Sequence, residues 1–317
     1  MQPQHVAGFI AEIQKALASN WSDERLKALS DRTVPEEVSG QHGWLLRGDL
    51  STVWGRWFIE SLVDLAPFQL DSNLNIAHVH AQVLAHFNQA SPHSPKDERD
   101  KYARILTDFA WQLVQARRDR KRLTITVAMR DELWAQAQPD PRCYLCGYEF
   151  GSEARGKFLG ESGDLPIVPS LVDFTRPRTR PAHACIEVDH VTPVAQGGKT
   201  ETFNLRLACG WCNSVKNRYT NIYDAIPWAS GIVTLPELGA VTQPQALWVL
   251  RTVATRRRCE SPDGCPVRIE DAELFAAPRN PKGAMTPVNV GVYCQQHDPW
   301  AVARWIGPQR LADALVK

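Results

Sequence analysis

Two pairs of cysteines, each separated by two residues, constrain this chain more than any other feature. Cys143 and Cys146 form the first pair, and Cys209 and Cys212 form the second. Two such knuckles can supply four thiolates to one tetrahedral zinc ion. Disulfide frameworks belong mainly to short secreted chains, whereas these eight cysteines are spread over 317 residues. We therefore expect a structural zinc site at this tetrad and no disulfide bonds.

A second set of potential ligands lies further along the chain. It comprises Cys259, Cys265, Cys294 and His297. A Cys3His zinc site is the favoured interpretation, and free thiols are the alternative. The sequence therefore predicts one or two structural zinc ions per chain. The remaining cysteine, Cys185, is expected to be a small buried hydrophobic residue.

Composition and length indicate a globular protein of two or three domains. Hydrophobic residues make up 44% of the chain and charged residues 22%, and single cores stop growing near about 250–300 residues. No uninterrupted apolar stretch is long enough to span a membrane. The N-terminus lacks a basic region and carries Glu12 where a signal peptide would be apolar. We expect a cytoplasmic protein without a membrane partner.

Charge is unevenly distributed along the chain. Residues 1–100 hold 8 basic and 13 acidic side chains, a net charge of −5. Because the whole chain has a net charge of +1, residues 101–317 carry a net charge of +6. Basic clusters are typical of surfaces that bind polyanions, although they can also be ordinary solvated helix faces. The clusters here are Arg117–Arg118 with Arg120–Arg122, then Arg176, Arg178 and Arg180, and finally Arg256–Arg258.

The hydrophobic pattern predicts an α+β protein in three parts. We expect a helical domain for recognition or dimerisation at 1–122, a central domain at 123–224 and a small zinc-binding α+β domain at 225–317. Apolar periodicity predicts helices at 50–65, 74–87 and 102–113, with their large apolar side chains on the buried face. In the last part we expect a helix at 245–256 capped by Thr242, paired strands at 274–278 and 288–293, and a closing helix at 300–316.

The segment 184–218 has the pattern of two strands and a helix. Short apolar runs at 184–191 and 205–208 suit strands, Gly197-Gly198 suits a turn between them, and 210–218 suits a short helix. Asp189 and His190 end the first strand, and Asn213 lies on the helix. An Asp-His pair at this place can be a simple strand end or part of a catalytic site.

This segment resembles the HNH, or ββα-metal, nuclease family, in the subgroup that carries a four-cysteine zinc site. The resemblance covers residues 141–224 and rests on motifs that occur together and in order: Asp-His, Gly-Gly, Asn-Leu, Cys-x2-Cys-Asn and a following Lys. It implies that the central domain is a ββα-metal fold. The 147–186 span would be an insertion, with the three arginines of 174–181 suited to contact DNA.

The resemblance also implies roles for individual residues. His190 would be the general base, Asp189 a ligand of a divalent cation, and Asn204 a brace for the loop that holds the base. The family's last position, often His, is Asn213 here, so the motif is His-Asn-Asn and Asn213 would join Asp189 on the metal. Oxygen ligands favour Mg2+ or Mn2+. Three cations could neutralise neighbouring phosphates: Arg206, Lys216 and Arg218.

The predicted function is a metal-dependent HNH endonuclease that hydrolyses DNA, in restriction or defence. Cleavage of both strands would require two active sites, which would suit a homodimer. The alternative is a non-catalytic zinc module on a degenerate HNH scaffold that binds nucleic acid or a partner protein. A nuclease directed at RNA would differ only in its substrate.

Overall fold

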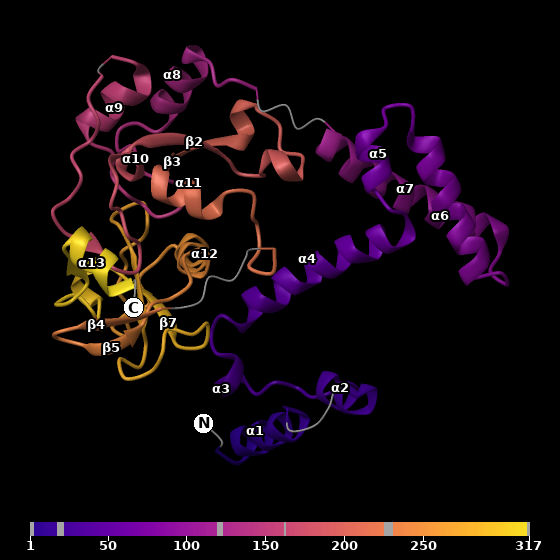
Figure 1. The fold of residues 1–317 in the computed structure, drawn as a ribbon, viewed down its shortest axis with the longest axis horizontal. Coiled ribbons are helices and arrows are strands. Elements are labelled where there is room, and N and C mark those ends of the chain that lie inside the picture. Colours follow the sequence, from indigo (N-terminus) through magenta and orange to yellow (C-terminus); the bar gives the residue numbers. More distant parts are fainter. Residues whose placement is uncertain (1–2, 18–21, 119–122, 162, 225–230, 316–317) are drawn as a thin grey trace.

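The computed structural model describes residues 3–17, 22–118, 123–161, 163–224 and 231–315. It confirms an α+β protein in which N-terminal helices precede a central region of paired strands and a C-terminal region of short hairpins (Figure 1). Buried apolar side chains form three clusters, one in each of these parts. Among the described residues, no helix is both long and apolar enough to cross a membrane.

The N-terminal part consists of helices, as expected. They are α1 Pro3–Leu17, α2 Asp23–Ser30, α3 Glu36–Ser39, α4 Gly43–Leu62, α5 Ala66–Leu70, α6 Ile76–Ala90 and α7 Lys96–Arg118. Asn75 caps α6 by accepting a hydrogen bond from the Ala77 amide, which satisfies a donor that the helix leaves unpaired. The C-terminal end of α4 packs with α5, α6 and α7 around Phe68, Val79 and Val83.

The expected burial of the large apolar side chains on α4 and α7 is wrong in part. On α4, Val53 and Leu62 are buried, but Trp54, Trp57 and Phe58 are each more than half exposed. The buried face of α7 is lined by small residues: Ala103, Thr107, Ala110 and Val114. Small residues let α7 approach its neighbours closely. Three larger apolar side chains, Leu106, Trp111 and Leu113, are partly buried against the same cluster, whereas Tyr102, Ile105 and Phe109 are exposed.

Helix α4 connects two of the hydrophobic clusters (Figure 1). Its first turns belong to the C-terminal cluster through Leu45, and its last turns belong to the N-terminal one. Asp49 is buried and pairs with Arg251 of the C-terminal part. Just before the helix, Nε2 of buried His42 lies 3.1 Å from the Val290 carbonyl oxygen. Helix α4 therefore packs against both the N-terminal and the C-terminal part.

The central part contains the predicted strand–strand–helix unit. Strand β2 Ile186–His190 pairs antiparallel with β3 Leu205–Cys209, and α11 Gly210–Lys216 follows directly. Ile186 lies opposite Cys209, and His190 lies opposite Leu205. The intervening loop contains two short 3-10 turns, η1 Val194–Gln196 and η2 Thr202–Asn204. Three more helices surround the unit: α8 Val127–Gln136, α9 Ser152–Leu159 and α10 Pro181–Ala184.

Short hairpins and two helices build the C-terminal part. Its elements are β4 Ile232–Leu235, β5 Gly239–Thr242, α12 Ala246–Arg256, β6 Phe275–Pro278, β7 Val290–Tyr293, β8 Trp305–Ile306 and α13 Pro308–Leu315. The hairpin of β6 and β7 is confirmed. Two expectations are wrong: Gln245, not Thr242, precedes α12, and the chain forms β8 before α13 begins. Pro308 lacks an amide hydrogen and therefore suits the first turn of α13.

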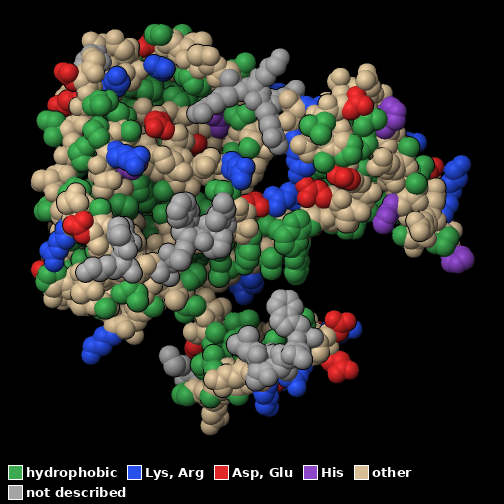
Figure 2. Space-filling model, in the orientation of Figure 1, with side chains coloured by type: hydrophobic (Ala, Val, Ile, Leu, Met, Phe, Trp, Pro, Cys, Tyr) green, Lys and Arg blue, Asp and Glu red, His purple; other side chains and the backbone are tan. Residues whose placement is uncertain are grey.

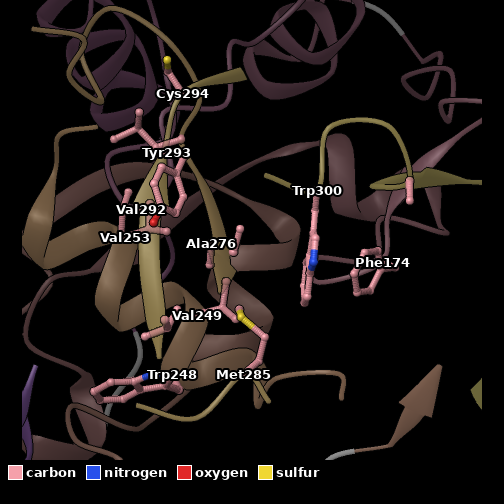
Figure 3. Packing of buried hydrophobic residues seen from close by; sticks show 14 of the residues in the cluster. Phe174, Trp248, Val249, Val253, Ala276, Met285, Val292, Tyr293, Cys294 and Trp300 are labelled. Atoms are coloured by element: carbon pink, nitrogen blue, oxygen red, sulfur yellow. The ribbon is translucent and has the colours of Figure 1, made fainter. Parts of the chain in front are cut away.

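The later part of the 147–186 insertion packs on this C-terminal part. Its strand β1 Val172–Asp173 pairs with β8, and Phe174 lies 5.0 Å from Trp300, measured between ring centroids (Figure 3). The guanidinium groups of Arg176 and Arg178 are buried and both bind Glu273 at 2.7 Å. The expectation that all three arginines of this stretch contact DNA is therefore wrong: two are internal counterions, since a buried charge needs a partner. Arg180 is exposed.

Candidate active site and metal centres

A cleft opens where β2 ends beside α11. It has a volume of ≈ 470 Å³, and its walls include Asp189, His190, Asn213 and Arg218. The antiparallel register places Asp189 and His190 at the carboxyl end of β2, while α11 returns across the hairpin with Asn213 in its second turn. The fold thus brings a carboxylate, an imidazole, an amide and an exposed guanidinium to one cavity.

The carboxylate of Asp189 is buried and held from two sides. The Tyr144 hydroxyl donates a hydrogen bond to it at 2.6 Å, and the Lys216 ammonium lies 2.9 Å away. Burial, and next the charge of Asp189, raise the pKa of Tyr144, so its hydroxyl stays protonated and donates. Lys216 also donates to the His190 carbonyl at 2.6 Å. Lys216, expected to contact phosphate, is thus a buried partner of Asp189.

Hydrogen bonds from Thr200 and Asn204 help to hold His190 and its loop. The His190 Nε2 atom lies 2.9 Å from the Thr200 hydroxyl oxygen. Asn204 ties both sides of the loop together, because its amide nitrogen donates to the carbonyls of Thr192 and Lys199, at 3.1 and 2.9 Å, and its oxygen accepts from the Thr192 amide. This is the geometry of a brace, the role that the sequence resemblance implied for Asn204.

Asn213 faces a second carboxylate. Its amide nitrogen donates a short hydrogen bond to Glu187, which lies two residues before Asp189 on β2. Side chains two residues apart on a strand share a face. With the nitrogen engaged by Glu187, the amide oxygen is the atom that Asn213 can offer to a cation. The donor set of Asp189 and Asn213 is therefore made of oxygen atoms, which suits Mg2+ or Mn2+.

The four cysteines of the first tetrad come together as a metal site. All four are buried, and their sulfur atoms lie within 4.8 Å of one another. Cys146 and Cys209 sulfurs are 3.9 Å apart, close to the spacing of about 3.8 Å on a tetrahedron with Zn–S bonds of about 2.3 Å. Hydrogen bonds from Cys143 and the other two thiols lower the pKa of Cys209 well below its ordinary value. The tetrad could hold a metal ion.

This ββα geometry agrees with one comparison of known proteins. An HNH endonuclease family model matches residues 178–218. The matched range contains β2, its loop, β3 and α11, and with them the Asp189, His190, Asn204 and Asn213 positions. The family resemblance is thus confirmed for an HNH domain at the centre of the chain. Neither the curated proteins nor the solved structures contain a match to this chain.

The second cluster also assembles. Cys259, Cys265, Cys294 and His297 place one ligand atom each within 4.8 Å of the others, although two of them are only partly buried. The Cys294 sulfur lies 3.9 Å from that of Cys265 and 3.2 Å from His297 Nδ1. Burial opposes ionisation of Cys294, but the hydrogen bonds from His297 prevail and lower its pKa to about 7. This set could hold a metal ion as well.

Several arginines of the basic clusters form ion pairs and hydrogen bonds within the protein. Arg117 pairs with Glu60, Arg118 donates to three backbone carbonyls, and Arg256 pairs with Glu260. The rest of the first run, 120–122, lies outside the described residues. Among the three predicted phosphate ligands, Arg218 lines the cleft and is exposed, and exposed Arg206 donates to nearby carbonyls.

Sequence reasoning missed three residues of this site: Tyr144, Glu187 and Thr200. Glu187 could have been found from the strand period, because it shares a face with Asp189. Thr200 lies two residues after the Gly-Gly turn, but nothing in the spacing indicates that its hydroxyl reaches the imidazole. Tyr144 lies inside the first cysteine knuckle, and only the folding of that knuckle against β2 brings its hydroxyl to Asp189.

Proposed function

We propose that this protein is a metal-dependent HNH endonuclease that hydrolyses DNA phosphodiester bonds, with His190 as the general base. The observation that carries the proposal is the cleft itself, in which Asp189, His190 and Asn213 meet on the ββα unit that the family model matches. No other proposal uses the braced imidazole, the oxygen ligands and an exposed arginine together.

His190 takes the proton of the attacking water in this proposal. An imidazole has an ordinary pKa near neutrality and is therefore suited to act as a general base. Thr200 and Asn204 fix its position through the ring and the loop. Arg218 at the rim of the cleft offers its charge to a phosphate. A divalent cation, when bound, supplies positive charge at the scissile phosphate.

Asp189 and Asn213 would hold that cation, and Mg2+ or Mn2+ fits their oxygen donors. The two cysteine clusters would hold structural zinc, two ions per chain. Lys216 now neutralises the Asp189 carboxylate, so cation binding requires the ammonium to share or leave that oxygen. We further propose domains at 1–122, 123–224 and 225–317, a cytoplasmic role in restriction or defence, and a homodimer for cleavage of both strands.

A plasmid-nicking assay tests the proposal. Purified protein is incubated with supercoiled DNA and Mg2+ or Mn2+, and the His190→Ala variant is compared with His86→Ala, which removes an exposed imidazole from α6. We expect at least about a hundredfold loss for His190→Ala, because a general base contributes about 10²–10⁴ in rate. His86→Ala should cleave as the wild type does. Equal cleavage by both variants would sink the mechanism.

One observation favours a second candidate, a non-catalytic zinc module on an HNH scaffold. The Lys216 ammonium occupies the position beside Asp189 that a cation would approach. This candidate predicts DNA or protein binding and bound zinc, with no cleavage in any divalent cation. The same assay separates the two, and matched DNA and RNA substrates identify which nucleic acid is cut.

A further inference from the structure

The long helix α7 forms one wall of a groove that leads away from the catalytic cleft. A hollow of ≈ 570 Å³ lies between α7 and the loop 197–201, and another of ≈ 630 Å³ lies between α7 and α4. Val194 lines both the catalytic cleft and the first hollow, and Gln112 and Ala116 line both hollows. The three cavities are therefore neighbours that share wall residues.

Close packing fixes α7 against the catalytic loop. Gly197 has a φ of +93°, and a Cβ atom there would lie only 2.5 Å from the Ala116 Cβ. Only glycine combines this backbone conformation with such close approach. Thr200 lines the first hollow and also contacts His190 at 2.9 Å. A group in this hollow would thus lie one hydrogen bond away from the proposed base.

The described polar groups of the first hollow suit a nucleobase. Gln112 and Gln115, three residues apart on one face of α7, present exposed amides that can both donate and accept. The Lys199 Nζ atom lies 3.9 Å from a carboxylate oxygen of Glu201, so the two side chains offset each other's charge. Amide side chains pair with the edges of nucleobases, whereas phosphates are bound mainly by cations.

The second hollow adds aromatic faces. Phe58 of α4 and Phe109 of α7 both line it, and each is 53% exposed. Arg56, a cation in the lining, is already bound to Asp224 through two hydrogen bonds of 2.6 and 3.1 Å. The hollow is therefore nearly neutral and partly apolar. Exposed phenyl rings suit the stacking of unpaired bases.

We propose that the groove along α7 binds the bases of an unpaired DNA segment next to the scissile phosphate. Gln112 and Gln115 contact the edge of one base, and Phe58 and Phe109 stack against the next. Figure 2 shows a gap between helices α5–α7 and the central part of the molecule, and Figure 1 shows α4 running below that gap. The inference rests on the proposed function, since it places the substrate strand beside the proposed catalytic cleft.

Binding measurements on the full chain test the groove without requiring cleavage. In the His190→Ala background, fluorescence anisotropy compares a labelled single-stranded DNA oligonucleotide with an abasic one of equal length and with the duplex. Stacking on one aromatic ring is worth about tenfold in affinity. We expect Phe109→Ala to lose about tenfold for the base-bearing single strand and nothing for the abasic strand or the duplex.

Tyr102→Ala is the matched control, because Tyr102 lies on α7, is 52% exposed, and is not among the residues that line the hollow. Phe109→Tyr should retain the base-dependent affinity, which separates stacking from a folding defect. An unchanged affinity in Phe109→Ala, an equal loss with the abasic strand, or an equal loss with the duplex would overturn the proposal. If the wild-type protein binds bases in this way but never cleaves, the proposed endonuclease function is wrong and the proposed base-binding groove stands.

The amides have their own test. Gln112→Ala with Gln115→Ala should change which nucleotides flank the cut, when cleavage products of a random-sequence pool are sequenced. Gln82→Ala with Gln89→Ala, two exposed glutamines on α6, should leave that preference unchanged. If the wild type and both double variants show the same preference, the glutamines do not contact the bases and that part of the proposal is wrong. If the wild type does not cleave at all, the proposed function is wrong instead.

Discussion

The two cysteine clusters look alike in the sequence and differ in what they hold together. The first is fully buried, and it joins two knuckles far apart in the sequence, since Cys146 and Cys209 are 63 positions apart. Cys209 ends β3, and Cys212 directly precedes Asn213. The second cluster, partly exposed at Cys265 and His297, lies at the end of the β6–β7 hairpin.

This difference determines which cluster can influence the chemistry. In the first knuckle, the Tyr144 hydroxyl reaches Asp189, and the helix that carries Asn213 begins at the tetrad. In the second cluster, the neighbouring Glu260 binds the Val292 amide at 3.0 Å and Arg279 at 2.8 Å, which ties together the C-terminal core. The first cluster therefore supports the candidate active site, and the second supports a hydrophobic core.

Breaking the first tetrad should have the largest effect. In Cys212→Ala, three buried thiols remain without their fourth partner, so we expect loss of the bound zinc and of ordered structure around α11. Structural zinc sites can contribute most of the folding free energy of small zinc domains. Zinc content and near-ultraviolet circular dichroism measure the loss, and cleavage should fall to background. Cys185→Ala, at the cysteine outside both clusters, should change none of these.

Removal of the link between the tetrad and Asp189 sharpens the comparison. Tyr144→Phe deletes a hydroxyl that donates to a buried carboxylate, and a hydrogen bond to a charged group is worth about 1.5–3 kcal/mol. We expect cleavage to fall about tenfold or more with zinc content unchanged. Tyr148→Phe, two residues after the same knuckle, is the control. If Tyr144→Phe cleaves normally, the tetrad acts as a scaffold only.

The sequence was sufficient for the region where local rules and long-range packing agree. Strand alternation, the Gly-Gly turn and the cysteine spacing all predicted the β2–β3–α11 unit, and the structure contains it. The same rules could not give the contacts of Tyr144, since a hydroxyl in a knuckle finds its carboxylate only after the ribbon folds. Nor could they show that Arg176 and Arg178 are buried counterions of Glu273.

The helices show the opposite case. Apolar residues that recur every three and four positions predicted that Trp54, Trp57 and Phe58 face the core, as large apolar side chains usually do. In the structure, Ala103 and Ala110 occupy the buried face of α7, and the aromatics remain exposed. Periodicity identifies a helix face but not which neighbour covers it. The exposed Phe58 and Phe109 are the same rings that line the groove.

Breaking the second cluster should affect stability more than chemistry. Cys294→Ala removes the thiol closest to His297 and should release about one zinc per chain and lower the melting temperature by several degrees. Cleavage measured well below that temperature should stay within about twofold of the wild type, because none of the four residues of this cluster is among the described residues that line the cleft. Loss of cleavage at low temperature, with zinc still bound at the first tetrad, would contradict the division of roles.

The ion pair between Arg56 and Asp224 lies outside both clusters and should give the smallest effect. The hydrogen bonds from Arg56 hold the pKa of Asp224 below its ordinary value of 3.8. Its stabilisation is therefore fully present above about pH 4 and disappears as the pH falls through the lower folded-state pKa. Partly exposed pairs are worth about 1 kcal/mol or less. Asp224→Asn should thus lower the melting temperature slightly at pH 7, and the difference from the wild type should shrink toward pH 3. Glu149→Gln, at an exposed carboxylate beside Arg142, provides the comparison, and a larger loss for it than for Asp224→Asn would show that α4 is not anchored by this pair.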